Sequence, residues 1–265
     1  MSKTIDLFFE IKQRLAKAGH DPKYFQEAHI MEVTDEIYDA VMKTHVEDSI
    51  RIREDKSLSP PPIPASAKPP ADTVVLGFPY LTEARQMFLL NAERDGRINM
   101  SLLRPDFYPT YLGSYKPGVR GVTHNAFPNK EHQDQAVTHL FFTAALFDLL
   151  NTPKFVTRTP LASRQTKRRL VKRGISGAEK WHKITWNLSE PKAPPRESRG
   201  GGWKMPLHYT RGHWRRSERA KKNVHVLNDG NTYQWIEGFW SGHPAFGIKR
   251  SYYSVVDKEK ECLDA

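Results

Sequence analysis

The residues best suited to chemistry lie in one C-terminal stretch, residues 204–256, which is rich in histidine, arginine and tryptophan. Cleavage of RNA without a metal needs a base and an acid that titrate near neutral pH, together with cations that stabilise the phosphorane charge. His213 and Glu237 have the right types for the two catalytic roles, and Arg211 and Arg215 supply cations beside them. A metal-independent ribonuclease is therefore one hypothesis for this stretch, based on residue types.

Binding of a nucleic acid without cleavage makes fewer demands on the same stretch. Cations that neutralise phosphates, together with flat side chains that stack on bases, are typical of proteins that bind RNA or single strands. The residues with these properties are Arg211, His213, Arg215, Trp235, Trp240 and Tyr252. A competing structural interpretation places Trp214, Trp235 and Phe239 in the core of a sheet, because aromatic residues on strands are often buried. The arginines then form a solvated face or pair with Glu237.

Other site chemistries find little support in the sequence. His208 and His213 are five positions apart, so a regular strand sends them to opposite faces, and no metal site is predicted. No serine lies in a Gly-x-Ser-x-Gly turn, and the glycines at 200–202 lack the Lys-Ser/Thr of a phosphate-binding loop. The single cysteine, Cys262, excludes an internal disulfide framework and is typical of a reducing cytosol. No cofactor is predicted.

Positive charge is concentrated in the second half of the chain. The 265 residues carry a net charge of +11, and residues 154–222 hold 20 Lys and Arg against 4 Glu, a local net charge of +16. Such clustering is typical of a surface that binds a polyanion, although a basic surface can also serve solubility alone. The predicted nucleic-acid contacts are Arg164, Lys167, Arg168, Arg169, Lys172, Arg173, Arg211, Arg215, Arg216, Trp235, Trp240, Lys249 and Arg250.

Two predicted elements precede this half of the chain. Residues 1–56 are predicted to form a helical lobe, with helices at 5–18 and 35–53 and a further start signal at Asp21-Pro22. Residues 57–72 contain six prolines, which fix φ and remove backbone donors, so this segment is predicted to be a semi-rigid linker. An alternative is a docking site for a proline-binding partner.

Residues 73–265 are predicted to form one α+β domain. Strands are expected at 73–78, 84–93 and 97–103, with a hairpin turn at Asp95-Gly96. Residues 106–128 are expected to form an ordered aromatic loop that has room for a short strand. Residues 131–150 are apolar nearly all round, which predicts a central helix that holds His139 as a satisfied core histidine. A basic surface helix at 164–173 and strands at 181–188, 205–215, 232–239 and 248–256 complete the domain. The fold class is therefore α+β: a helical N-terminal lobe and a mostly antiparallel sheet packed on a central apolar helix.

Several C-terminal segments, taken in order, resemble a family of proteins encoded by bacteriophages and prophages. The segments are FDLLNTPKFVTR, RQTKRRLVKRG, WHKITWNL, HYTRGHWRR, and WIEGFWSG followed by IKRSYYSV. The resemblance spans residues 147–256 and carries no known activity, so it transfers no catalytic residue. It implies an origin in a phage or mobile element and a shared C-terminal domain. The matching positions are Asn151, Pro153, Arg211, Gly212, His213, Trp235, Trp240 and Gly242, and Ser241 stands where the family often has arginine.

The leading hypothesis is a phage-encoded accessory protein of the host cytoplasm that binds RNA or single-stranded DNA through a basic, aromatic-rich C-terminal surface. The alternatives are the ribonuclease with His213 and Glu237, and a protein whose basic face binds and modulates a host protein or belongs to the virion. No apolar run approaches the roughly 18 residues of a membrane span, and residues 1–15 do not have the pattern of a secretory signal. No membrane partner is predicted.

Overall fold

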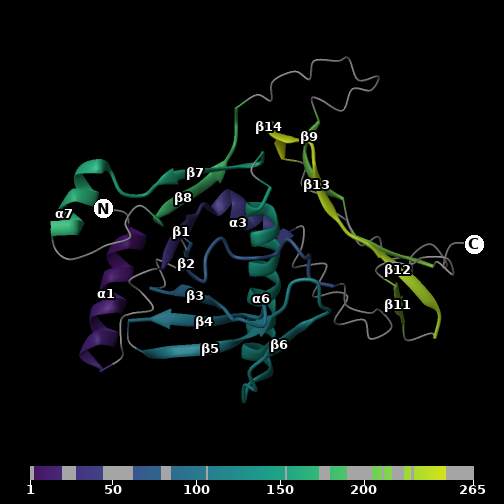
Figure 1. Ribbon diagram of the computed structural model, residues 1–265, viewed down its shortest axis with the longest axis horizontal. Coiled ribbons are helices and arrows are strands. Elements are labelled where there is room, and N and C mark those ends of the chain that lie inside the picture. Colours follow the sequence, from purple (N-terminus) through teal and green to yellow (C-terminus); the bar gives the residue numbers. More distant parts are fainter. Residues whose placement is uncertain are drawn as a thin grey trace, which may run out of the picture.

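An eight-stranded mixed sheet with helices on both faces forms the centre of the protein (Figure 1). The computed structural model describes residues 3–19, 28–43, 62–78, 85–105, 107–152, 154–172, 180–189, 205–210, 212–216, 224–227 and 230–248. The strand order in this sheet is β6-β5-β4-β3-β2-β1-β8-β7. Its strands are β1 (His29–Val33), β2 (Thr73–Gly77), β3 (Met87–Ala92), β4 (Ile98–Arg104), β5 (Phe107–Tyr115), β6 (Val122–His124), β7 (Val156–Pro160) and β8 (His182–Trp186).

Most neighbouring strands of this sheet are antiparallel, and the exception is β1. It pairs in parallel with β2 on one side and with β8 on the other. The β3–β4 hairpin confirms the turn predicted at Asp95-Gly96, because Gly96 adopts a φ of 82° and the Glu93 amide donates to the Arg97 carbonyl at 2.7 Å. The combination of helices and a mostly antiparallel sheet confirms the α+β class.

Helix α6 (Lys130–Leu150) covers one face of the sheet together with α3 (Asp35–Val41). The side chain of Asn129 accepts from the Glu131 amide at 2.8 Å and caps the start of α6. Buried side chains lie almost all round its C-terminal half, as the sequence predicts for a central helix. Phe142 lies at the middle of this layer, with ring centroids 4.8 Å from Tyr38 and 5.3 Å from Phe78.

Helices α1 (Lys3–Lys17) and α7 (Arg164–Lys172) cover the opposite face. Ile5, Phe8 and Ile11 of α1 are buried against β2 and β3, since they fall on one side of the helix at helical spacing. On α7, Leu170 is the one buried side chain, and it anchors an otherwise polar helix to this core. The two faces therefore have separate hydrophobic cores, each under its own pair of helices.

The N-terminal section does not form a lobe apart from the sheet. It contributes the expected helices α1 and α3, but β1 lies between them in sequence and occupies the middle of the sheet. The predicted boundary near residue 57 is therefore not a division of the fold, because β1 obtains its hydrogen bonds from strands far along the chain. The start signal at Asp21-Pro22 and most of the helix predicted beyond Val41 lie outside the described residues.

The described part of the proline-rich segment, residues 62–72, packs on the domain and is not a spacer. Ile63 and Ala67 are buried in the core under α6. The Asn151 side chain, just beyond α6, donates to the carbonyls of Ser66 and Lys68 at 2.6 and 2.9 Å. Backbone hydrogen bonds hold the segment as well, since the Ile63 amide donates to the Val119 carbonyl at 2.9 Å and the Gly118 amide donates to the Ile63 carbonyl at 2.8 Å.

Two strands, β5 and β6, lie in the segment where an ordered aromatic loop with at most a short strand was predicted. β5 and β6 extend the sheet to its edge, and the pairing of β4 with β5 shifts register between Met100 and Ser101. Gly113 at this shift has a φ of 152°, and a Cβ there would lie 2.3 Å from the Thr123 carbonyl. The sequence did not predict these strands because the Tyr, Pro and Gly residues of the segment show no regular alternation of apolar and polar side chains.

Two small three-stranded sheets follow the main sheet in sequence. β9 (Pro206–Thr210), β13 (Phe239–Ser241) and β14 (His243–Ile248) form one of them, in the order β13-β9-β14. β10 (His213–Arg216), β11 (Val224–Val226) and β12 (Thr232–Ile236) form the other, in the order β10-β12-β11. The strand predicted at 248–256 lies outside the described residues beyond Ile248.

Candidate nucleic-acid interface and aromatic ribbon

The strands β9, β10, β12 and β13 form one long two-stranded structure, which we call the C-terminal ribbon. Thr210 pairs with Phe239 in β9 and β13, and His213 pairs with Ile236 in β10 and β12, so both halves keep the same antiparallel register. Gly212 and Gly238 stand where the two halves meet. A Cβ on Gly212 would lie 2.9 Å from the Gly238 amide nitrogen, so this close approach of the two backbones requires glycine.

The ribbon presents different faces to the domain on either side of these glycines. Trp240 belongs to the core under α6 and contacts Tyr209 at a ring separation of 5.4 Å. Trp235 lies five positions earlier, so a regular strand would place it on the opposite face. It nevertheless lines a cleft on α6 and contacts Trp214 at 4.8 Å. We infer that the ribbon turns over at the glycine pair.

The register of the ribbon separates the predicted catalytic pair. His213 is directly opposite Ile236, and Glu237 is the next residue, so alternation sends the imidazole and the carboxylate to opposite faces. Both side chains are exposed, and no hydrogen bond or ion pair joins them among the described residues. Arg215 donates to the Gln234 side chain at 2.8 Å, and Arg211 lies outside the described residues. The geometry needed for acid–base catalysis by this pair is absent from this part of the structure.

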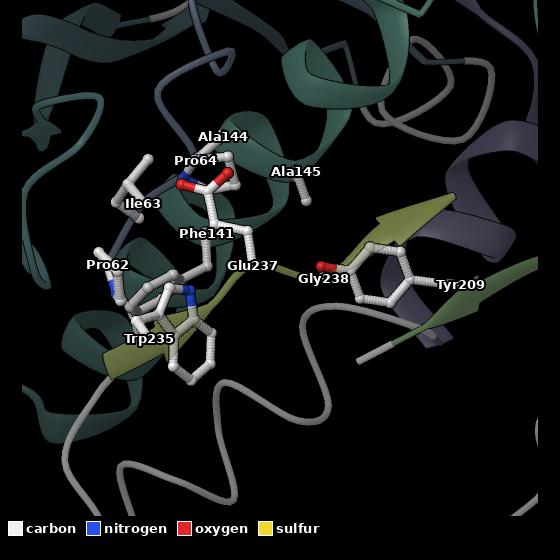
Figure 2. Close-up of a pocket in the computed structure, with 10 residues that line it drawn as sticks. All are labelled: Pro62, Ile63, Pro64, Phe141, Ala144, Ala145, Tyr209, Trp235, Glu237 and Gly238. Atoms are coloured by element: carbon white, nitrogen blue, oxygen red, sulfur yellow. The ribbon is translucent and has the colours of Figure 1, made fainter. Parts of the chain in front are cut away.

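The cleft beside the ribbon is small and mainly apolar (Figure 2). Its walls are the rings of Trp235, Phe141 and Tyr209, the proline-rich residues 62–64 and two alanines of α6. The carboxylate of Glu237 points from the ribbon toward α6. The cavity volume of about 70 Å³ admits a few water molecules, at ~10–15 Å³ each, but no nucleobase.

The tryptophans that were predicted to stack on bases are therefore mostly enclosed by neighbouring side chains. Trp240 is 6% exposed and Trp235 is half-buried against its neighbours. The guanidinium of Arg120 lies 5.0 Å from the ring of Trp214, and its Nε and Nη2 are buried without a hydrogen-bond partner among the described residues. Trp240 is core, and its ring contacts those of Trp186 and Tyr209. The alternative interpretation placed Trp214, Trp235 and Phe239 in the core, but the first two are half-buried and Phe239 is 56% exposed.

A second surface gathers cations without a described acidic residue among them, and we call it the basic edge. It consists of β7, α7 and β8, at the end of the main sheet. The described residues of 154–189 include no Asp or Glu. None of its cations forms an ion pair with a described carboxylate. Its nine cations are Lys154, Arg158, Arg164, Lys167, Arg168, Arg169, Lys172, Lys180 and Lys183.

Local structure holds these cations at the surface. The Ser163 side chain accepts from the Thr166 amide at 3.1 Å and caps α7, as predicted. Since only Leu170 points inward, the arginines and lysines of α7 lie on its outer sides, with Lys167 half-buried and the others exposed. Arg173, also predicted to make contact, lies outside the described residues.

The pKa of His182 in β8 is affected by the cations of the basic edge. Burial lowers the pKa of His182, and the charges of Arg158 and Lys167 lower it further, against a backbone hydrogen bond to Lys180 that raises it. Arg158 belongs to β7 and Lys167 to α7, so cations from two elements act on one imidazole of β8. The elements of the basic edge therefore contribute to one shared positive potential.

The basic edge and the C-terminal ribbon are separate surfaces. α7 lies near one end of the long axis of the molecule, and β11 and β12 lie toward the other end (Figure 1). α7 packs on the core of α1, whereas the ribbon packs on the core of α6. The expectation of one continuous basic and aromatic surface is therefore wrong for α7 and the ribbon, because they pack on opposite faces of the main sheet. The edge strand β8 does approach the ribbon, since the ring centroids of Trp186 and Trp240 are 6.5 Å apart. Lys249 and Arg250 lie outside the described residues, and Arg216 is exposed on the ribbon.

Comparison of the chain with models of known protein families, with curated proteins and with solved structures finds no match. Among the described residues, no three or more His, Cys, Asp and Glu side chains group together as metal ligands would. Within the same residues, no helix has the length and hydropathy needed to cross a membrane.

Proposed function

We propose that this protein binds nucleic acid, and that the basic edge is the surface that contacts the phosphates. The observation that carries the proposal is the gathering of nine cations on and directly beside three adjacent elements, without an acidic residue among those described. Cations that replace condensed counterions on a polyanion gain affinity from ion release. A phage-encoded accessory role, as the C-terminal resemblance implies, fits this proposal and stays a prediction.

The chemistry of the basic edge favours contact with the backbone of the nucleic acid. The tryptophan and phenylalanine residues of this edge are Phe155 and Trp181, which are buried, and Trp186, which is half-buried. Stacking on bases needs exposed rings, whereas phosphate contacts need only cations and carry no direct sequence information. Trp240 is also buried, so it does not offer a ring for stacking on bases. The prediction that the ligand is RNA or single-stranded DNA, and not duplex DNA, therefore loses part of its support. Duplex DNA belongs in the test beside single strands.

The test is a salt titration of binding to labelled oligonucleotides, followed by fluorescence anisotropy. The edge variant replaces Arg164, Arg168, Arg169 and Lys172 by glutamine. A matched control variant replaces four exposed cations elsewhere, Lys17, Arg94, Lys116 and Lys130, so the net charge of the two variants is the same.

We expect the wild type to lose affinity steeply with salt. Each phosphate contact contributes roughly 0.7 to 0.9 to the slope of log K against log salt, so the edge variant is expected to lose up to about 3 from that slope. The control variant should keep most of it. A flat salt dependence, or equal losses in the two variants, would remove the basic edge as the interface.

The other two functions receive less support. The ribonuclease hypothesis required His213 and Glu237 to converge on one phosphate, and the register places them on opposite faces of the ribbon. A host-protein partner for the basic face would give a complex that survives nuclease treatment. The oligonucleotide titration separates that outcome from nucleic-acid binding.

A further inference from the structure

A larger cavity lies away from both surfaces described so far. It has a volume of about 290 Å³ and lies between the N-terminal half of α6 and the strands β4 and β5. This is close to the lower end of the range for small-molecule sites, roughly 300 to 1,000 Å³. In strand order it is at the opposite end of the main sheet from β7 and β8, so nucleic-acid binding at the basic edge does not involve it.

α6 presents one row of side chains to this cavity. His132, Gln135, Ala136 and His139 are spaced i, i+3, i+4 and i+7, which places them on one face of the helix over two turns. At 1.5 Å per residue this row is about 10 Å long. The opposite wall comes from the sheet, so the cavity depends on the packing of α6 across β4 and β5.

Arg104 supplies a positive charge to the cavity. It lies at the end of β4 and is half-buried, and its Nε and Nη2 lie 3.3 and 3.2 Å from the Gln86 side-chain oxygen when that amide faces it. The amide orients the guanidinium but leaves its charge unneutralised. The residues that line the cavity include no carboxylate. A half-buried arginine with free donors in such a place is suited to an anion.

His139 supplies a hydrogen-bond donor to the cavity. Its Nδ1 is sealed and has no partner among the described residues, so the prediction of a satisfied core histidine is wrong for this atom. Burial lowers the pKa of His139 to about 4, so the ring is neutral at pH 7. A proton on the sealed Nδ1 would be an unsatisfied donor, so the neutral ring keeps its proton on Nε2. Nε2 is then the donor that the His139 ring can offer to a group in the cavity.

The remaining walls are apolar. Leu102 and Leu112 of the sheet, Phe127 and Ala136 line the cavity beside the polar groups. We infer that this cavity binds a small organic anion with an apolar body of about one aromatic ring, whose carboxylate or phosphate pairs with Arg104 and accepts from His139.

The test uses saturation-transfer NMR with named probes on the full chain. Benzoate and phenyl phosphate carry the ring and the charge, and benzyl alcohol carries the ring alone. We expect at least one of the two acids to bind the wild type at least tenfold more tightly than benzyl alcohol does. The preferred acid then distinguishes a carboxylate site from a phosphate site. Equal binding of all three, or no binding, overturns the inference.

Three variants locate the binding. Arg104→Gln removes the charge, and Ala136→Leu fills the cavity while Arg104 remains, so each is expected to weaken the acid at least tenfold. The control, Arg97→Gln, removes an exposed arginine that pairs with Asp95 on the β3–β4 hairpin. The edge variant described above shows whether the acid binds at the basic edge instead. Unchanged affinity in the folded Ala136→Leu protein, or loss in the edge variant, overturns the assignment.

Discussion

His139 makes a specific prediction about stability against pH. Its pKa is about 6.5 in an unfolded chain and about 4 in the folded protein, and burial is the cause. Because the charged form is disfavoured in the fold, the unfolded chain takes up the proton first as the pH falls. Stability from the neutral ring is therefore complete above pH 6.5 and is lost as the pH falls toward 4.

The size of this loss follows from proton linkage. With these two pKa values the free energy of unfolding falls by about 2 kcal/mol between pH 7 and pH 5, and by about 3 kcal/mol at pH 4. These are upper values, since the His139 ring is partly exposed on its cavity side. Even half of this effect, about 1 kcal/mol, is a measurable fraction of the total stability of a typical domain, ~5 to 15 kcal/mol.

The assay is urea denaturation of the wild type and of His139→Phe at pH 7 and pH 5, followed by tryptophan fluorescence. Phenylalanine keeps a ring of similar size beside Phe88, whose centroid lies 4.8 Å from the imidazole. The variant should lose less stability than the wild type on going to pH 5, by about 1 to 2 kcal/mol. Gln135→Leu, on the same face of α6, controls for altered packing and should keep the wild-type pH dependence. Parallel losses in the wild type and His139→Phe would refute the reasoning.

Two further predictions concern packing. Phe142→Ala, at a fully buried position, should destabilise by roughly 3 to 5 kcal/mol, whereas Phe239→Ala, at a position 56% exposed, should stay within about 0.5 kcal/mol in the same urea assay. Equal effects would contradict the burial of the α6 layer. Gly212→Ala should cost about 1 to 3 kcal/mol, because the added Cβ would lie 2.3 Å from the Trp235 ring, and Thr210→Ala serves as the exposed control. A neutral Gly212→Ala would show that the two strands do not meet as closely as described.

The sequence by itself determined the elements whose signals are local. The apolar run of α6, the Asp95-Gly96 turn and the Ser163 cap of α7 each depend on residues within a few positions of one another. Their secondary structure and the polar outer surface of α7 were therefore predictable. The row of cavity residues on α6, from His132 to His139, was also visible as a helical spacing, although nothing local showed that a cavity faces it.

Only the tertiary structure decided which of these elements meet. β1 lies in the middle of the sheet because its partners, Thr73–Gly77 and His182–Trp186, are distant in sequence, and no local pattern encodes that pairing. The same holds for Arg104 and His139, which come from a strand and a helix that pack across one cavity. The net charge of residues 154–222 follows directly from the sequence. The sequence does not show that some of these cations lie on the basic edge and others on the C-terminal ribbon. Helix α7 and the ribbon pack on opposite faces of the main sheet, and a sheet is assembled from contacts that the order of residues along the chain does not reveal.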